Sequence, residues 1–172
     1  MRIFYFDASA LAKRYVKEKG SEIVLRIFSA VAVVNMRALM IGLAEVVSIF
    51  VRKKNGGVIS HELFRASLLL FKQEILENLH FKKLEADSIL ISRAIPLIEK
   101  HSINSTDACV LRSAMDIAAF EKERGNALSL VTADKRLDAA AKAEGLHTIN
   151  PELVSLSEIE TLLASSAGSS MP

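Results

Sequence analysis

The sequence predicts an α/β fold in which helices cover both faces of a central parallel sheet. Short apolar runs, typical of strands buried on both faces, alternate along the chain with longer segments of helical periodicity. Only 7 glycines and 3 prolines occur among 172 residues, which argues against a turn-dense all-β protein. Because 51% of the residues are hydrophobic and 24% are charged, the chain is expected to bury a core as a single domain.

The first half of the chain predicts two strands and four helices. The apolar run at residues 3–6 stops at Asp7, as expected of a buried strand, and the run at 31–34 has the same character. Gly20 separates two short helices, and the Asn-Gly-Gly stretch at 55–57 ends a long one. The helices are predicted over residues 9–15, 21–28, 38–54 and 63–79.

The second half predicts three more strands, at residues 80–84, 127–132 and 147–149. Between and beside them, helices are predicted over residues 87–100, 105–124 and 135–144, the second of these starting at a Ser-Thr cap. Residues 1–151 are expected to form the functional domain. Residues 152–172 are expected to add a helix and a small-residue tail that is partly disordered.

Composition also limits the kind of protein and its compartment. The single cysteine, Cys109, cannot form an intrachain disulfide and excludes a cysteine-rich metal site. No signal peptide is recognisable, and the longest charge-poor stretch, 38–51, is shorter than the roughly 20 residues that a membrane span needs. A soluble, cytoplasmic protein is therefore expected. The net charge of +2 neither requires nor excludes a nucleic-acid partner.

Four acidic residues stand where a parallel sheet places its ligand site. Asp7 follows the first strand, Asp134 follows the strand at 127–132, and Asp107 lies at a helix start. Glu45 lies inside an apolar helical stretch. Each aspartate alone could be a helix cap, and Glu45 could lie on a polar stripe or pair with an arginine. If the four converge, they repel one another unless a divalent cation is bound, and an all-oxygen ligand set suits Mg²⁺ or Mn²⁺.

The segments that carry these acids form four motifs in a fixed order. They are Phe6-Asp7-Ala8-Ser9-Ala10-Leu11, Leu43-Ala44-Glu45-Val46, Ser105-Thr106-Asp107-Ala108-Cys109-Val110-Leu111 and Val131-Thr132-Ala133-Asp134-Lys135-Arg136-Leu137. In order and spacing they resemble the PIN-domain ribonucleases, in particular the VapC-like toxins of toxin–antitoxin pairs. The resemblance extends from residue 3 to about residue 151, and the segment from Ala140 to Pro151 also looks like that family.

The resemblance implies a three-layer α/β/α sandwich and assigns roles within it. It implies that residues 1–151 are a PIN-like nuclease domain whose metal-binding and catalytic residues are Asp7, Glu45, Asp107 and Asp134. It places supporting hydroxyls at Ser9, Thr106 and Thr132. In one departure, Asn35 stands at the predicted end of the second strand where Ser or Thr is common in the family, and the path from there to Glu45 is longer than usual.

The expected partners are RNA, an antitoxin protein and a second copy of the chain. Four cations near the acidic motifs are candidates for contacts to RNA phosphates, or else for solvated helix surface: Lys13, Arg14, Lys135 and Arg136. The helix at 63–79 has more apolar residues than one core stripe requires. It is either packed on two sides within the domain or offers a face for a homodimer or an antitoxin, both of which the resemblance implies.

These observations predict a divalent-metal-dependent endoribonuclease, the toxin of a toxin–antitoxin pair, in which a metal-activated water attacks phosphorus. The alternative is a non-catalytic PIN-fold module that binds RNA or protein. A haloacid-dehalogenase-type phosphatase also begins with Asp after a strand. That family has a second Asp two residues later, however, where this chain has Ser9.

Overall fold

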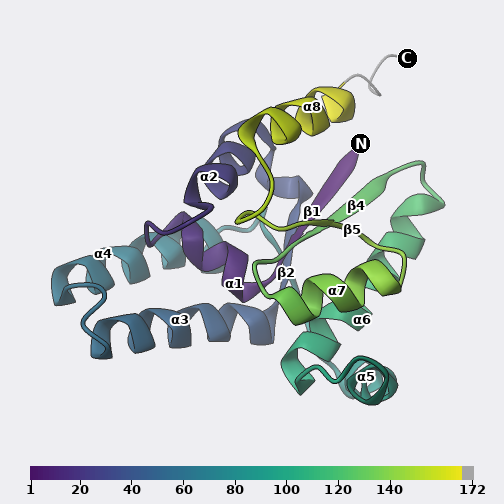
Figure 1. Cartoon of the computed structure of the whole chain (residues 1–172), viewed down its shortest axis with the longest axis horizontal. Coiled ribbons are helices and arrows are strands. Elements are labelled where there is room, and N and C mark those ends of the chain that lie inside the picture. The colour runs from purple at the N-terminus through teal and green to yellow at the C-terminus, as the bar shows by residue number, and fades with distance from the viewer. Residues whose placement is uncertain (168–172) are drawn as a thin grey trace.

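A five-stranded parallel sheet crosses the centre of the computed structural model, which describes residues 1–167 (Figure 1). The strand order is β3-β2-β1-β4-β5, so the first strand is the central one. The strands are β1 (Arg2–Phe6), β2 (Met36–Leu39), β3 (Lys82–Leu84), β4 (Ala127–Val131) and β5 (His147–Ile149). Because all the strands are parallel, their carboxyl ends meet at one edge of the sheet.

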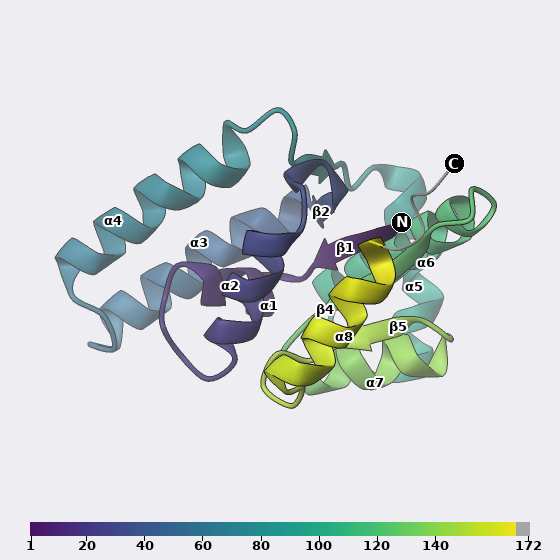
Figure 2. The same ribbon diagram turned by 90° about the horizontal axis from the view of Figure 1, so that it is seen from above.

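Helices cover both faces of this sheet, which confirms the expected three-layer α/β/α architecture (Figure 2). The α-helices are α1 (Ala8–Leu11), α2 (Ser21–Ala30), α3 (Met40–Asn55), α4 (His61–Phe71), α5 (Ser88–His101), α6 (Ser105–Lys122), α7 (Lys135–Ala143) and α8 (Leu156–Ala167). Two short 3₁₀ turns (Ala12–Arg14 and Val33–Asn35) and a π-helical turn (Lys72–Leu76) complete the described chain.

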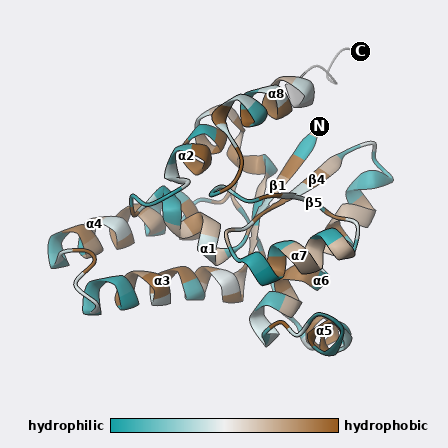
Figure 3. Ribbon diagram, in the orientation of Figure 1, coloured by the Kyte–Doolittle hydropathy of each residue, from teal (hydrophilic) through white to brown (hydrophobic). Residues whose placement is uncertain are grey.

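Strand β1 divides the core into two layers because its side chains alternate between the faces of the sheet. Phe4 and Phe6 pack with α1, α2, α3 and α4, whereas Ile3 and Tyr5 pack with α5, α6 and α7. All four side chains are buried, and Figure 3 shows the apolar character of the strand. The continuous apolar run thus reflects burial on both faces, as predicted from the sequence.

The second strand lies further along the chain than predicted. Residues 31–34 are not a strand: Val33–Asn35 form a 3₁₀ turn and Val34 is exposed, while β2 begins at Met36. The apolar run was misleading because Arg37 interrupts the real strand. The Arg37 guanidinium is accommodated there by an ion pair with the buried Glu121 carboxylate, 2.5 Å away.

Because β2 ends at Leu39, the path along the chain from the strand end to Glu45 is shorter than the sequence predicts. Strand β2 ends at Leu39 and α3 begins at Met40, so Glu45 lies in the second turn of a helix that starts directly at the strand end. Asn35 precedes the strand and therefore lies at the opposite end of β2 from the acidic residues.

The predicted helix at 63–79 differs in its limits. It begins at His61, where Ser60 Oγ accepts a hydrogen bond from Leu63 N at 3.1 Å, and its α-helical part ends at Phe71 before the π-helical turn. The predicted helix at 9–15 is likewise divided into α1 and a 3₁₀ turn. Of the predicted tail, residues 165–167 belong to α8, and residues 168–172 lie outside the described part of the chain. Within residues 1–167, no helix has the length and apolar character needed to cross a membrane.

Candidate active site at the carboxyl edge of the sheet

Asp7 is the most tightly held of the predicted acids. It directly follows β1, caps α1 and is 3% exposed. Its Oδ2 accepts hydrogen bonds from Ser9 N at 3.1 Å, Ser9 Oγ at 2.6 Å and Thr132 Oγ1 at 3.1 Å. Burial raises the pKa of Asp7, and these hydrogen bonds act in the opposite direction by stabilising the carboxylate.

Two of the three predicted hydroxyl residues, Ser9 and Thr132, join the end of β1 to the end of β4. Thr132 Oγ1 donates to Asp7 and accepts from Asp134 N at 3.0 Å, so one hydroxyl links two of the acidic residues. Ser9 Oγ accepts from Ala133 N at 2.9 Å in the same way. Ser9 and Thr132 therefore fix the position of Asp7 relative to the loop that carries Asp134.

Asp134 caps a helix and still presents a carboxylate oxygen. Its Oδ1 accepts from Arg136 N at 2.7 Å and from Leu137 N at 3.0 Å, which satisfies two N–H groups at the start of α7. The side chain is half-buried, and Oδ2 takes no part in the cap. Asp134 can therefore cap α7 through Oδ1 while Oδ2 stays available as a metal ligand.

Asp107 lies in the first turn of α6 and is held by a residue that the sequence reasoning missed. Asn104, rather than the predicted Ser-Thr pair, caps the helix: its Oδ1 accepts from Asp107 N at 2.8 Å. The Asn104 amide also donates through Nδ2 to Asp107 Oδ2 at 2.8 Å. An N-cap residue three positions before an acid is the pattern of a capping box, which could have identified Asn104. Thr106 is half-buried beside them and makes no side-chain hydrogen bond within residues 1–167.

The four acids act on one another electrostatically. The pKa of Asp107 is raised to about 7, first by burial and then by the negative charges of Asp7, Asp134 and Glu45. The pKa of Glu45 is raised by burial and by the charges of Asp7 and Asp134, with Arg52 opposing them. Glu45 is half-buried on α3 and has no hydrogen bond or ion pair among the described residues. The structure therefore brings the four predicted carboxylates into one region of negative potential.

The donor set fits a hard divalent cation, although the side chains do not enclose one. In the described chain, no three His, Cys, Asp or Glu side chains are arranged so that they could hold a metal ion together. Carboxylates that repel one another are expected to stand apart when no cation is present. The residues nonetheless offer only oxygen donors, which Mg²⁺ and Mn²⁺ prefer, and their unbalanced negative charge favours a cation.

Two of the four predicted cations lie at this site. A cavity of about 370 Å³ is lined by Asn104, Asp107, Ala133, Asp134, Lys135 and Arg136. Lys135 and Arg136 are exposed, and the charge of Arg136 lowers the pKa of Asp107. Both residues therefore line the same cavity as the carboxylates of Asp107 and Asp134.

The other two predicted cations are held in ion pairs. Lys13 is 4% exposed, and its Nζ lies 2.7 Å from Glu152 Oε1 and 3.2 Å from Glu18 Oε1. Arg14 donates to both carboxylate oxygens of Glu74, and its guanidinium lies 5.3 Å from the Phe28 ring centre. Lys13 is thus placed in the interior, and Arg14 is engaged by its partners.

We predict that Lys13 stabilises the fold and does not bind RNA. Lys13→Met should lower the free energy of unfolding by about 1–3 kcal/mol, because it leaves the partly buried Glu152 without its ammonium partner and leaves Glu18 with Lys53 alone. Urea denaturation measures this loss. Lys17→Met is the matched control, since Lys17 is exposed, and it should change stability by less than about 0.5 kcal/mol. A Lys13→Met protein that is as stable as wild type but binds RNA more weakly would contradict this assignment.

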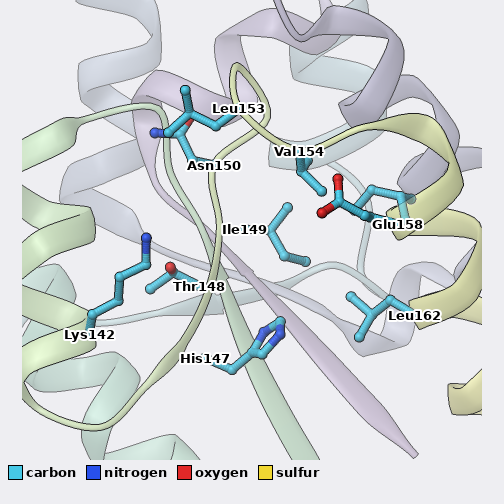
Figure 4. Close-up of a pocket in the computed structure, with 10 residues that line it drawn as sticks. Lys142, His147, Thr148, Ile149, Asn150, Leu153, Val154, Glu158 and Leu162 are labelled. Atoms are coloured by element: carbon cyan, nitrogen blue, oxygen red, sulfur yellow. The ribbon is translucent and has the colours of Figure 1, made fainter.

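A second cavity, of about 360 Å³, lies between β5 and α8, away from the acids (Figure 4). Its polar side chains already have partners: Thr148 Oγ1 donates to Asp138 at 2.5 Å, and His147 Nδ1 lies 2.9 Å from Ser129 Oγ. Glu158 accepts from Ser155 N and Oγ, both at 2.7 Å. Contacts within the fold therefore hold these side chains of the second cavity.

Solved structures share the architecture of this chain, whereas no family model and no curated protein sequence matches it. PAE2754 from Pyrobaculum aerophilum matches with a TM-score of 0.58 at 19% identity, over 96% of this chain and 96% of its own. VapC20 from Mycobacterium tuberculosis, a sarcin-ricin loop cleaving toxin, matches with a TM-score of 0.57 at 13% identity, over 80% of this chain and 94% of its own. FitAcB from Neisseria gonorrhoeae matches with a TM-score of 0.56 at 14% identity, over 88% of this chain and 100% of its own.

At these identities the likeness shows a shared fold. It agrees with the parallel sheet of order β3-β2-β1-β4-β5 and with the two helical layers. The chain has a VapC-like PIN fold.

Proposed function

We propose that the protein is a divalent-metal-dependent endoribonuclease that acts as the toxin of a toxin–antitoxin pair. The observation that carries this proposal is the electrostatic coupling of four carboxylates from four separate segments at one edge of the sheet. Repulsion among the four carboxylates lowers the stability of the folded protein, and a bound cation would relieve it. The solved structure of VapC20, a sarcin-ricin loop cleaving toxin with the same fold, supports an endonuclease as the class of enzyme.

In this proposal Asp7, Glu45, Asp107 and Asp134 hold Mg²⁺ or Mn²⁺. The ion, when bound, supplies an activated water and neutralises charge on the phosphodiester. Ser9 and Thr132 keep Asp7 oriented. Lys135 and Arg136 hold the RNA backbone against the repulsion of the carboxylates.

The proposal is tested by incubating the purified chain with a mixed RNA pool in Mg²⁺, Mn²⁺ or EDTA. Cleavage that requires either metal and stops in EDTA is expected. A single-stranded DNA pool and a phosphate monoester, offered in parallel, identify the substrate class. Turnover of the monoester without RNA cleavage would overturn the proposal.

We further propose that the helical hairpin of α3 and α4 meets the protein partners. Figure 2 shows these two helices side by side and projecting beyond the sheet. Phe71 and Ile75 pack into the core, whereas Leu69 and Leu70 are 58% and 42% exposed. Such a face is suited to an apolar segment of an antitoxin or to a second copy of the chain. Co-expression with the adjacent open reading frame and sedimentation analysis distinguish the two partners.

We predict that Arg136 contributes one phosphate contact to RNA binding. On an Asp7→Asn background, which keeps the RNA intact, Arg136→Ala should weaken binding at every sequence. It should also reduce the slope of log K against log salt by about 0.7, the value for one single-strand phosphate contact. Lys142→Ala, near the far end of the same helix and paired with Asp138, is the control and should leave the slope unchanged. An unchanged slope in Arg136→Ala would remove this residue from the interface.

A non-catalytic binding module is the second candidate function. The observation in its favour is that no three metal-ligating side chains within residues 1–167 are arranged to hold an ion. RNA binding without cleavage in either metal, together with no Mn²⁺ binding by calorimetry, would favour it over the nuclease.

A further inference from the structure

We propose that Asn104 is a positioning residue for Asp107, distinct from the four carboxylates. The inference deepens the proposed function and rests on it, because it concerns how one carboxylate is prepared to bind a cation. It arises from the contacts of a single amide at the start of α6, on the wall of the cavity next to Asp107 and Asp134.

The Asn104 side chain makes two hydrogen bonds to the same residue. The first, from Asp107 N to Asn104 Oδ1, is the ordinary bond of a helix cap. The second, from Asn104 Nδ2 to Asp107 Oδ2, is not needed for capping. The cap of α5 shows the difference: Asp87 accepts one backbone N–H and, as a carboxylate, donates no hydrogen bond. At α6 the Asn104 side chain caps the helix and also holds the acid, as Ser155 does for Glu158 at the start of α8.

The second bond restrains a carboxylate that is otherwise weakly held. Asp107 is buried and surrounded by the negative charges of Asp7, Glu45 and Asp134. Within residues 1–167 its carboxylate accepts a side-chain hydrogen bond from Asn104 alone. The bond engages Oδ2, so Oδ1 is the oxygen left for a cation. Without the amide, the carboxylate is free to rotate away from its negative neighbours.

The same contact reduces the energy needed to assemble the site. An N–H donor directed at a carboxylate stabilises its charged form, which is the form that binds metal. Groups that hydrogen-bond to a metal ligand typically change metal affinity by about 10- to 100-fold when they are removed. Asn104 is exposed to solvent, so the lower end of that range is expected.

The experiment compares three variants of the full chain in which the cap and the donor are separated. Asn104→Gly removes the side-chain donor and keeps a residue that is well tolerated at a helix N-cap, whereas Asn104→Ala removes the donor and disfavours the cap. Asp87→Ala removes the cap of α5, away from the acids, and controls for loss of a cap alone. Mn²⁺ affinity is measured by calorimetry without RNA, thermal stability by circular dichroism in EDTA, and kcat and KM with RNA.

Asn104→Gly is expected to melt close to wild type, to bind Mn²⁺ roughly tenfold more weakly and to lower kcat with KM for RNA unchanged. Asn104→Ala should add a lower melting temperature to the same loss of affinity. Asp87→Ala should melt lower but bind Mn²⁺ like wild type. Wild-type Mn²⁺ affinity in Asn104→Gly would overturn the role of Asn104 and leave the nuclease proposal intact. A wild-type chain that binds no Mn²⁺ would overturn both.

Discussion

Asp7→Asn is expected to reduce metal-dependent RNA cleavage by roughly a thousandfold or more, while the protein stays folded. The reduction corresponds to the several kcal/mol that a metal ion contributes at a phosphoryl centre. Asp7 is the acid on which this effect should be greatest, because it is the most deeply buried of the four and adjoins the central strand. Its charge also contributes to the raised pKa values of Asp107 and Glu45.

The fold should survive this substitution because an amide can reproduce the hydrogen bonds of the carboxylate. Ser9 N, Ser9 Oγ and Thr132 Oγ1 all point to Oδ2, and the carbonyl oxygen of asparagine can accept from each of them. Replacing a buried charge by a neutral group also removes repulsion from its acidic neighbours. The melting temperature in EDTA is therefore expected to equal or exceed that of wild type.

The matched control is Asp87→Asn, which makes the same chemical change at the cap of α5, outside the acidic region. It should cleave RNA like wild type. Calorimetry with Mn²⁺ completes the comparison, since Asp7→Asn should bind the ion much more weakly. Full cleavage by a folded Asp7→Asn protein would exclude the assigned site.

The sequence predicts that Asp7 and Asp134 share one edge of the sheet because local and topological signals agree there. Asp7 and Asp134 follow buried strands, and parallel strands must bring their carboxyl ends to one edge. The second strand was predicted at residues 31–34 and lies at Met36–Leu39, because an apolar run does not by itself mark the position of a strand. The ion pair of Arg37 with Glu121 allows a charged residue inside β2, and no local pattern indicates that pairing.

Lys13 and Asn104 show what sequence reasoning could not supply. The partners of Lys13 come from residues 18 and 152, so its burial depends on a contact between distant segments. Asn104 lies beside its acid in sequence, and the capping-box spacing was available. That spacing identifies the cap, whereas only the structure shows that Nδ2 reaches the Asp107 carboxylate. Side-chain direction, rather than residue position, is the missing information in both cases.

The metal-free protein is expected to lose stability through Asp107 as the pH rises from about 5 to about 8. In the folded state the pKa of Asp107 is raised to about 7 from an ordinary value of 3.8, so the folded protein retains a proton that the unfolded chain releases. Raising the pH between these two values therefore favours the unfolded state. The stability is highest below the unfolded pKa and is lost as the pH passes the folded one.

Asp107→Asn isolates this contribution. Other groups titrate in the same range: burial lowers the pKa of His147, which makes stability rise with pH up to about its ordinary value. That effect is common to both proteins and cancels when the variant is compared with wild type. Thermal melts in EDTA across this pH range should show a smaller fall for Asp107→Asn. If stability depended on pH identically in the two proteins, ionisation of Asp107 would not destabilise the folded state.

Mn²⁺ should reverse the loss in wild type. Metal binding requires the ionised carboxylate, so affinity increases with pH and the ion raises the melting temperature more at about pH 8 than at about pH 5. The metal thus contributes most where the repulsion among the four acids is greatest. In Asp107→Asn this pH-dependent gain should be much smaller, because one of the charges that opposes folding and attracts the ion has been removed. An equal gain in both proteins would separate the stability effect from the metal site.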